Sequence, residues 1–256
     1  MKRFPHYLNR VLRPDANWLR NLPTNRAWGL VMVASVGFAT YGFTVGAWRA
    51  PEMGGYVAIK MPLLVMLTLG CNGLLNGLLG MLLHGTLSFR QSLMALLWAN
   101  ATAGVLLASI APITLGLAWN APAPDAANAV SAHAGYLLTH TILMAAVGIF
   151  SNLHLYRLLH GNGERGSLPT LFAWLAGNGL LGAQFSYILR PFFGSPNLKV
   201  AFIREDAFEG TFYESVWRSV LHITDGKEME SAVVLLFSLV ALIIFHTRPE
   251  KNLPNK

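Results

Sequence analysis

Three histidines, two within the apolar run 135–159 and one at its edge, are side chains of this sequence that could do chemistry. His133, His140 and His154 are separated by seven and fourteen residues, so a helix would place them near one face. Such a stripe suits metal binding or proton relay. The run holds no Asp or Glu, and the chain has no HExxH, GxSxG or phosphate-loop motif. We therefore expect ordinary hydrogen-bonding histidines and a non-enzymatic protein, with a metal site as the less favoured reading.

Amides and glycines recur in a second apolar run, GCNGLLNGLLG. Asn72 and Asn76 are four residues apart, as are Gly73 and Gly77, so each pair would share a helix face. Small residues at this spacing let a neighbouring backbone approach closely, and amides hydrogen-bond across helices. Helix packing is therefore the favoured reading. The alternative is a polar path through the membrane, which would also use Asn100, Asn178 and Gln184.

A third polar group lies in the stretch GAQFSYILRPFFGSPNLKVAFIREDAFEGTFYE, residues 182–214. Arg190 ends an apolar helix, where the last carbonyls lack partners and the helix dipole favours a cation. One reading is an ordered re-entry element pinned by ion pairs, such as Arg190 or Arg204 with Glu214. The other is a headgroup, lipid or partner site at the membrane surface. The candidate interface comprises Arg190, Pro191, Phe192, Gly194, Pro196, Arg204, Phe212, Tyr213 and Glu214.

The elements that would carry these residues are transmembrane helices. Of 256 residues, 54% are hydrophobic and 12% are charged, whereas charged residues make up about a quarter of a soluble protein. The composition predicts an all-α, polytopic helical membrane bundle. Pro62 would stand in the first turn of the second span, and Pro112 would kink or end the third. Six runs are candidate spans across a hydrocarbon core of about 30 Å: 27–48, 61–83, 92–117, 135–159, 170–189 and 231–246.

Charge sets the predicted orientation. Residues 1–26 form a basic arm and 249–256 a tail, and we place both in the cytoplasm of a cell with an inner membrane. Residues 27–248 then form one transmembrane domain, with Arg49 and Lys60 in outer loops as mildly contrary signs. Segment 192–229 is too charged to span, and we expect it to contain an amphipathic interfacial helix. The apolar residues in the centre of this segment recur at roughly helical spacing: Phe202, Ile203, Phe208, Phe212, Val216, Trp217 and Val220.

Net charge and cysteine usage exclude several classes. The net charge of +7 comes largely from the amino end rather than from a patch on a globular domain, so membrane topology explains it better than nucleic-acid binding. Cys71 is the single cysteine, which excludes a disulfide framework and a multi-cysteine metal centre. We expect Cys71 to be a small buried apolar residue.

Several motifs resemble a group of uncharacterised bacterial multi-pass membrane proteins, some of them described as Yip1-like. These motifs are YGFTVG, IKMPLL, SIAPIT and above all LRPFFGSP followed by FIRED and FYE, and the likeness covers most of the chain. The resemblance implies a membrane-embedded helical domain and a role for the segment around Arg190. It brings no activity, substrate or cofactor, although the name suggests a membrane-organising or trafficking accessory.

Three hypotheses for function follow. The first is a non-enzymatic accessory or scaffold of a bacterial membrane assembly, or a lipid-binding protein. The second is a small transporter or channel with an amide-lined path, and the third is an intramembrane metalloenzyme that uses the histidine stripe. The expected partners are the lipid bilayer and either other membrane proteins or a second copy of the chain. A cofactor is unknown.

Overall fold

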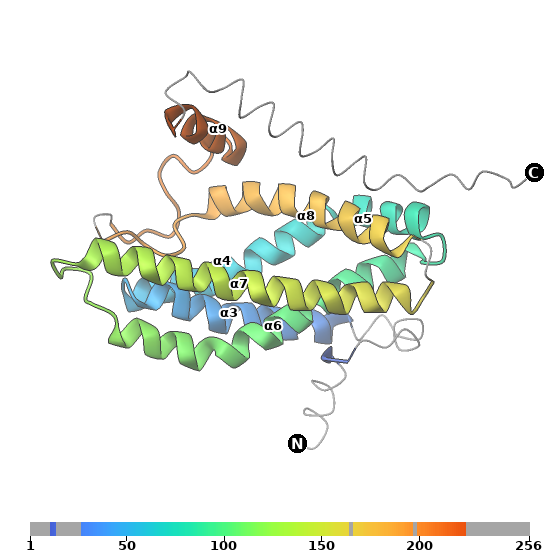
Figure 1. Cartoon of the computed structure of the whole chain (residues 1–256), viewed down its shortest axis with the longest axis horizontal. Coiled ribbons are helices and arrows are strands. Elements are labelled where there is room, and N and C mark those ends of the chain that lie inside the picture. The colour runs from blue at the N-terminus through green and yellow to red at the C-terminus, as the bar shows by residue number, and fades with distance from the viewer. Residues whose placement is uncertain (1–10, 14–26, 164–165, 197–198, 224–256) are drawn as a thin grey trace, which may run out of the picture. The chain divides into compact units, whose positions relative to one another are not determined.

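The computed structural model describes residues 11–13, 27–163, 166–196 and 199–223. Within these residues every regular element is helical, as the sequence predicts, and no strand occurs (Figure 1). The chain divides into two compact units, residues 1–208 and 209–256, which are described separately. The elements are α3 (Ala27–Ala47), α4 (Pro51–Cys71), α5 (Gly73–Leu79), the π-helix η2 (Gly80–His84), α6 (Phe89–Asn120), α7 (Ala129–His160), α8 (Ser167–Leu189) and α9 (Phe212–Ile223).

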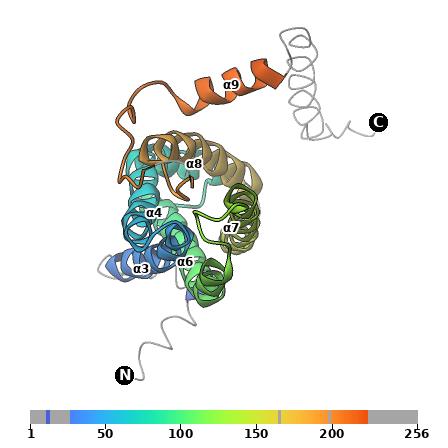
Figure 2. The same ribbon diagram turned by 90° about the vertical axis from the view of Figure 1, so that its left-hand side faces the viewer.

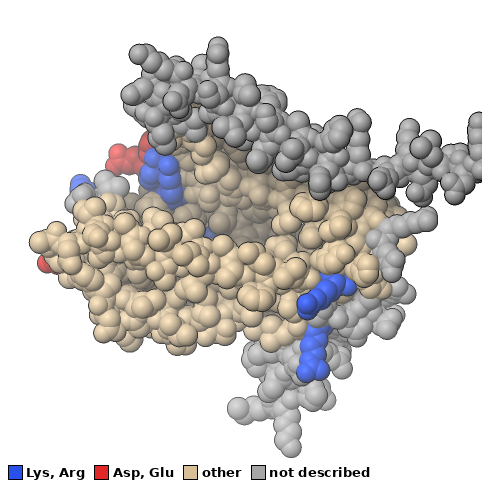
Figure 3. Space-filling model, viewed as in Figure 1, with Lys and Arg blue, Asp and Glu red and all other residues tan. Residues whose placement is uncertain are grey.

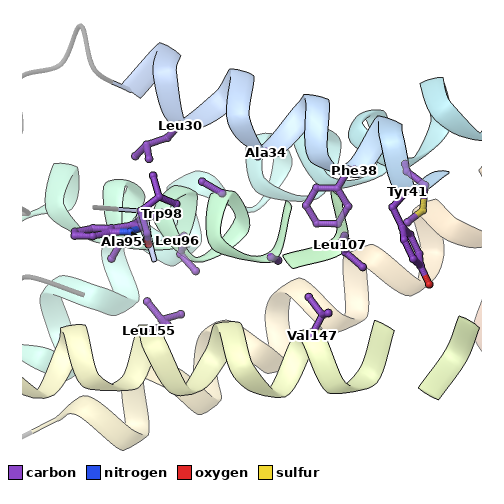
Figure 4. Packing of buried hydrophobic residues seen from close by; sticks show 14 of the residues in the cluster. Leu30, Ala34, Phe38, Tyr41, Ala95, Leu96, Trp98, Leu107, Val147 and Leu155 are labelled. Carbon is purple, nitrogen blue, oxygen red and sulfur yellow. Dashed lines mark hydrogen bonds between the residues drawn. The ribbon is translucent and has the colours of Figure 1, made fainter. Parts of the chain in front are cut away.

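The first unit is a helical bundle whose core lies between α3, α6 and α7. Helix α3 packs along both α4 and α6, α7 packs on α6, and α8 lies against α4 and α7 (Figure 2). Figure 4 shows Leu30 and Phe38 of α3 directed toward α6, with Val147 and Leu155 of α7 on the opposite side of the core. These side chains interdigitate because each helix turns one apolar stripe inward.

The outer surface of the long helices is also apolar. Four helices of the described residues, α3, α4, α6 and α7, are long and apolar enough to cross a membrane. On the face seen in Figure 3, charged side chains gather toward the two ends and the middle carries almost none. Large apolar side chains of α3, α6 and α7 are exposed on the outside of the bundle, including Met32, Val36, Ile113, Ile149 and Phe150. An apolar belt between charged ends indicates a membrane protein.

The second run begins ten residues earlier than the sequence suggested. Helix α4 starts at Pro51, where the missing amide proton costs nothing, and Glu52 lies in its first turn. Pro62 is therefore in the helix interior and not in the first turn, which corrects that prediction. The run also breaks at Asn72, between α4 and α5. Cys71, at the end of α4, is exposed rather than buried.

Helix α6 continues through Pro112 to Asn120, so of the two predicted outcomes, a kink or an early end, the early end is wrong. Such a proline is tolerated in a span because neighbouring groups satisfy the freed backbone. At the other end, Ser88 and Gln91 form a reciprocal capping box.

The amphipathic helix of the 192–229 segment begins later than predicted. Helix α9 begins only at Phe212, because Gly210 has a φ of 73° and Thr211 accepts a hydrogen bond from the Glu214 amide at 3.1 Å. Phe202, Ile203 and Phe208 are therefore not helical, which corrects their assignment. Of the predicted elements, the span 231–246, the tail 249–256 and most of the arm 1–26 lie outside the described residues.

Close backbone contact between helices occurs on α3. A Cβ on Gly37 would lie 2.2 Å from the carbonyl oxygen of Gly104 on α6. On Gly73 and Gly77, by contrast, a Cβ would meet side chains of α6 at 3.7 and 2.2 Å. The predicted glycine pair thus packs against side chains, and the backbone approach lies elsewhere.

Replacing Gly37 by alanine should destabilise the bundle, because the new methyl group would overlap the α6 backbone. We expect a loss of about 1–3 kcal/mol, seen as a lower Tm of the purified protein in detergent. Gly116→Ala on α6 is the matched control, since no atom lies within 4 Å of its Cβ position. Equal Tm values for the two variants would contradict the close contact.

Candidate functional site

A fully buried lysine is the most unusual group in the bundle. Lys60 has 0% of its surface exposed and lies nine residues after Pro51, about 14 Å along α4 at 1.5 Å per residue. Its Nζ donates to the carbonyl of Pro191 at 2.7 Å. The rings of Phe192 and Phe202 lie 5.8 and 5.2 Å from the same nitrogen. A charge inside a membrane span is costly unless it is paired, and here a carbonyl and two aromatic faces hold it.

The carbonyl belongs to a non-helical stretch that follows α8. Residues 190–196 and 199–204 are called the 190–204 segment below. Helix α8 ends at Leu189, as predicted, and Arg190 is extended. A second cation holds the same stretch, because the Arg49 Nε donates to the carbonyl of Ser195 at 3.1 Å. Gly194 packs closely on the Arg49 side chain. Irregular backbone that packs against a helical bundle needs such partners, because its polar groups have no helical hydrogen bonds of their own.

The ion pairs differ from those proposed for the re-entry element. Arg204 pairs with Asp206 at 3.2 Å, and Glu214 pairs with Arg218 one turn along α9. The 190–204 segment is therefore pinned chiefly by cations that donate to backbone carbonyls. Pro196 is half-buried in this segment, whereas Phe212, Tyr213 and Glu214 belong to the second unit.

An aromatic and histidine cluster lies beside the segment. His140 is fully buried, and its Nδ1 lies 2.8 Å from the Tyr41 hydroxyl. Tyr136 donates to the carbonyl of Thr44 and packs on the His140 ring at 4.4 Å. Phe193 meets the same imidazole edge-on, with ring centroids 5.8 Å apart. The cluster thus joins α3 and α7 to the 190–204 segment.

The three predicted histidines do not meet. His133 stacks on Trp48 with 5.4 Å between ring centroids, and His154 bonds the Phe150 carbonyl of its own helix at 2.9 Å. Within the described residues, no group of three or more His, Cys, Asp or Glu side chains is arranged for a metal ion.

The predicted amides do meet in part. Asn178 on α8 accepts from the side-chain amides of Asn72 at 3.0 Å and Asn76 at 2.9 Å. Trp174 of α8 also donates to the Asn76 backbone carbonyl at 2.7 Å. Gln184 lies further along α8 and is half-buried. Asn100 bonds its own helix, at the Leu96 carbonyl. Because the amides of buried Asn72 and Asn76 and half-buried Asn178 bond to one another, their geometry favours helix packing over an open polar path.

Sequence reasoning missed three members of this arrangement: Lys60, Arg49 and Tyr41. A usable signal was present for Lys60, since apolar residues continue on both sides of it. Starting the second run at residue 61 hid that signal. A second buried hydrogen-bond network was also missed. In it the His84 ring nitrogens form hydrogen bonds with the Leu159 carbonyl at 3.0 Å and the Thr86 hydroxyl at 2.8 Å.

No protein-family model, curated protein or solved structure matches this chain. The assignment of function therefore depends on the geometry of the site itself.

Lys60→Met should destabilise the protein, because methionine fills a similar volume but leaves the Pro191 carbonyl without its donor. An unsatisfied buried acceptor costs about 1–3 kcal/mol, so Tm in detergent should fall. Lys199→Met is the control, because Lys199 is exposed. An unchanged or higher Tm for Lys60→Met would show that the free energy lost by burying the ammonium group equals or exceeds the stabilisation from its contacts.

Asn178→Ala should lower stability as well, because it removes the acceptor shared by two buried amides. The expected loss is about 1–3 kcal/mol, measured by thermal unfolding and compared with Asn120→Ala at the exposed end of α6. If stability stayed unchanged, the packing role would fail and the polar-path reading would gain support.

Proposed function

We propose that this chain is a non-enzymatic accessory or scaffold of a bacterial membrane assembly, and that the 190–204 segment helps form its docking surface. The observation that carries this proposal is the pinning of the segment by Lys60 and Arg49 at the carbonyls of Pro191 and Ser195. A segment held in one conformation presents its side chains without a further ordering cost on binding.

The residues at and after the pinned segment suit protein recognition. Lys199, Glu205 and Asp206 are exposed and mixed in sign, which favours a partner of complementary charge. Phe208 follows them with 83% of its surface exposed. A large exposed aromatic beside charges is typical of an interface anchor. We therefore assign a second membrane protein as the partner.

The proposed topology has six spans, with both termini in the cytoplasm and the bundle in the inner membrane. In this topology α3, the α4–α5 run, α6, α7 and α8 are followed by a sixth span at 231–246. The 190–204 segment then faces the outer side, where no cytoplasmic nucleotide or soluble enzyme reaches it. The resemblance of LRPFFGSP and FYE to Yip1-like proteins supports an organising role.

The proposed place of α9 is the membrane interface. Tyr213, Val216 and Trp217 are each 44–46% exposed and share one side of this short helix. The Glu214–Arg218 pair occupies another side. Aromatic residues next to charges are favoured at the headgroup level. The basic arm 1–26 would add attraction to anionic lipid on the cytoplasmic side, at about 1 kcal/mol per basic residue near the surface.

Purification of the full chain in nanodiscs should recover a stoichiometric membrane-protein partner, identified by mass spectrometry. The double variant Glu205→Lys/Phe208→Ala should recover about 10-fold less, because it reverses one charge and removes the anchor.

The matched control is Asp125→Lys/Trp119→Ala, which changes an exposed acid and an exposed aromatic near the α6–α7 connection. Both variants should keep the wild-type Tm. A wild-type protein that purifies alone, or a partner retained in full by the first variant, would refute the docking role.

A further inference from the structure

Two arginines gather around one tyrosine at the start of the 190–204 segment. The guanidinium carbon of Arg190 lies 3.5 Å from the centroid of the Tyr187 ring, and that of Arg204 lies 5.3 Å from it. Stacking on an aromatic ring uses the face of a guanidinium. Its N–H donors point outward in the plane of the group, so stacking leaves them free to bind an acceptor.

Several of these donors are buried without an acceptor. The Arg190 Nε and the Nε and one terminal nitrogen of Arg204 have no hydrogen-bond partner within the part of the chain that the structure describes. The other terminal nitrogen of Arg204 bonds Asp206 at 3.2 Å. A buried donor on a charged group is expensive to leave unpaired, so each such group requires an explanation. Here three donors from two side chains lack an acceptor at one place.

The surroundings are positive. Two further cations contact this segment, since Arg49 donates to the Ser195 carbonyl and Lys60 to the Pro191 carbonyl. Residues 49–60 and 187–206 together hold five basic and three acidic side chains. The negative end of the α8 dipole opposes an anion here, but it amounts to only about half a charge against two guanidinium charges. The missing acceptor is therefore an anion.

We propose that Arg190 and Arg204 bind a phosphate group and that Tyr187 positions both guanidiniums for it. Arginine forks match the oxygens of phosphate in pairs, and a phosphate has enough oxygens to serve three donors on two side chains. The phosphate comes either from an anionic lipid headgroup, which snorkelling arginines at the end of a span can reach, or from free phosphate. This inference deepens the proposed function, because it uses the same segment.

The test uses the full chain in detergent, with native mass spectrometry and two probes: phosphatidylglycerol and inorganic phosphate. We expect one phosphatidylglycerol per protein, with affinity reduced at least about 10-fold in Arg190→Gln/Arg204→Gln. Arg157→Gln, an exposed arginine on α7, should bind like the wild type. If millimolar inorganic phosphate displaces the lipid, the ligand is free phosphate. If the lipid stays bound, the ligand is the lipid headgroup.

If Arg190→Gln/Arg204→Gln does not fold, the variant Arg190→Lys/Arg204→Lys is tested in its place. This variant keeps both charges but loses the forked donors, so a folded protein with weakened binding also supports the site. Wild-type protein that binds neither probe, or a folded variant that binds both normally, would overturn the proposal. Partner recovery from the same preparations separates the two ideas. If the protein recovers its partner but does not bind phosphate, only the phosphate site is refuted. If it binds phosphate but does not recover a partner, only the docking role is refuted.

Discussion

The first unit depends on one constraint: backbone that leaves a helix and packs within the bundle must find its hydrogen-bond partners in the protein. After Leu189 the chain is no longer helical, yet it packs into the bundle. Lys60 supplies the donor for Pro191, and Arg49 supplies the donor for Ser195. The dependence is mutual, because a fully buried ammonium needs an acceptor as much as the carbonyl needs a donor.

The positions of these two cations follow from how α3 meets α4. A Cβ on Gly42 or Gly46 would lie 2.6 or 2.5 Å from a carbonyl oxygen of α4, so the two helices touch through their backbones. This contact brings Arg49, between the helices, and Lys60, on α4, toward the same segment. The segment in turn sets Phe193 against His140 and holds Arg190 beside Tyr187. Small residues on one helix thus determine where charges stand on another.

The polar groups of the bundle fall into two kinds. The amides of Asn72, Asn76 and Asn178 bond to one another, and His84 is satisfied by Leu159 and Thr86. Such closed networks join helices and leave nothing for a ligand. The donors of Arg190 and Arg204 differ, because three of them lie near one tyrosine with no acceptor among the described residues, whereas His133, His140 and Thr170 each have a single such atom. This contrast is the reason that packing is assigned to the amides and anion binding to the arginines.

The sequence alone determined the features that depend on local pattern. Apolar runs and few charges predicted a helical membrane protein and the end of α8 at Leu189, because composition and helix-ending residues act over a few positions. The tertiary structure alone decided that α4 begins at Pro51 with Lys60 inside, that Gly37 meets Gly104, and that α9 starts only at Phe212. A lysine at the edge of an apolar run reads as a loop residue until its acceptor is known, and that acceptor lies 131 residues away.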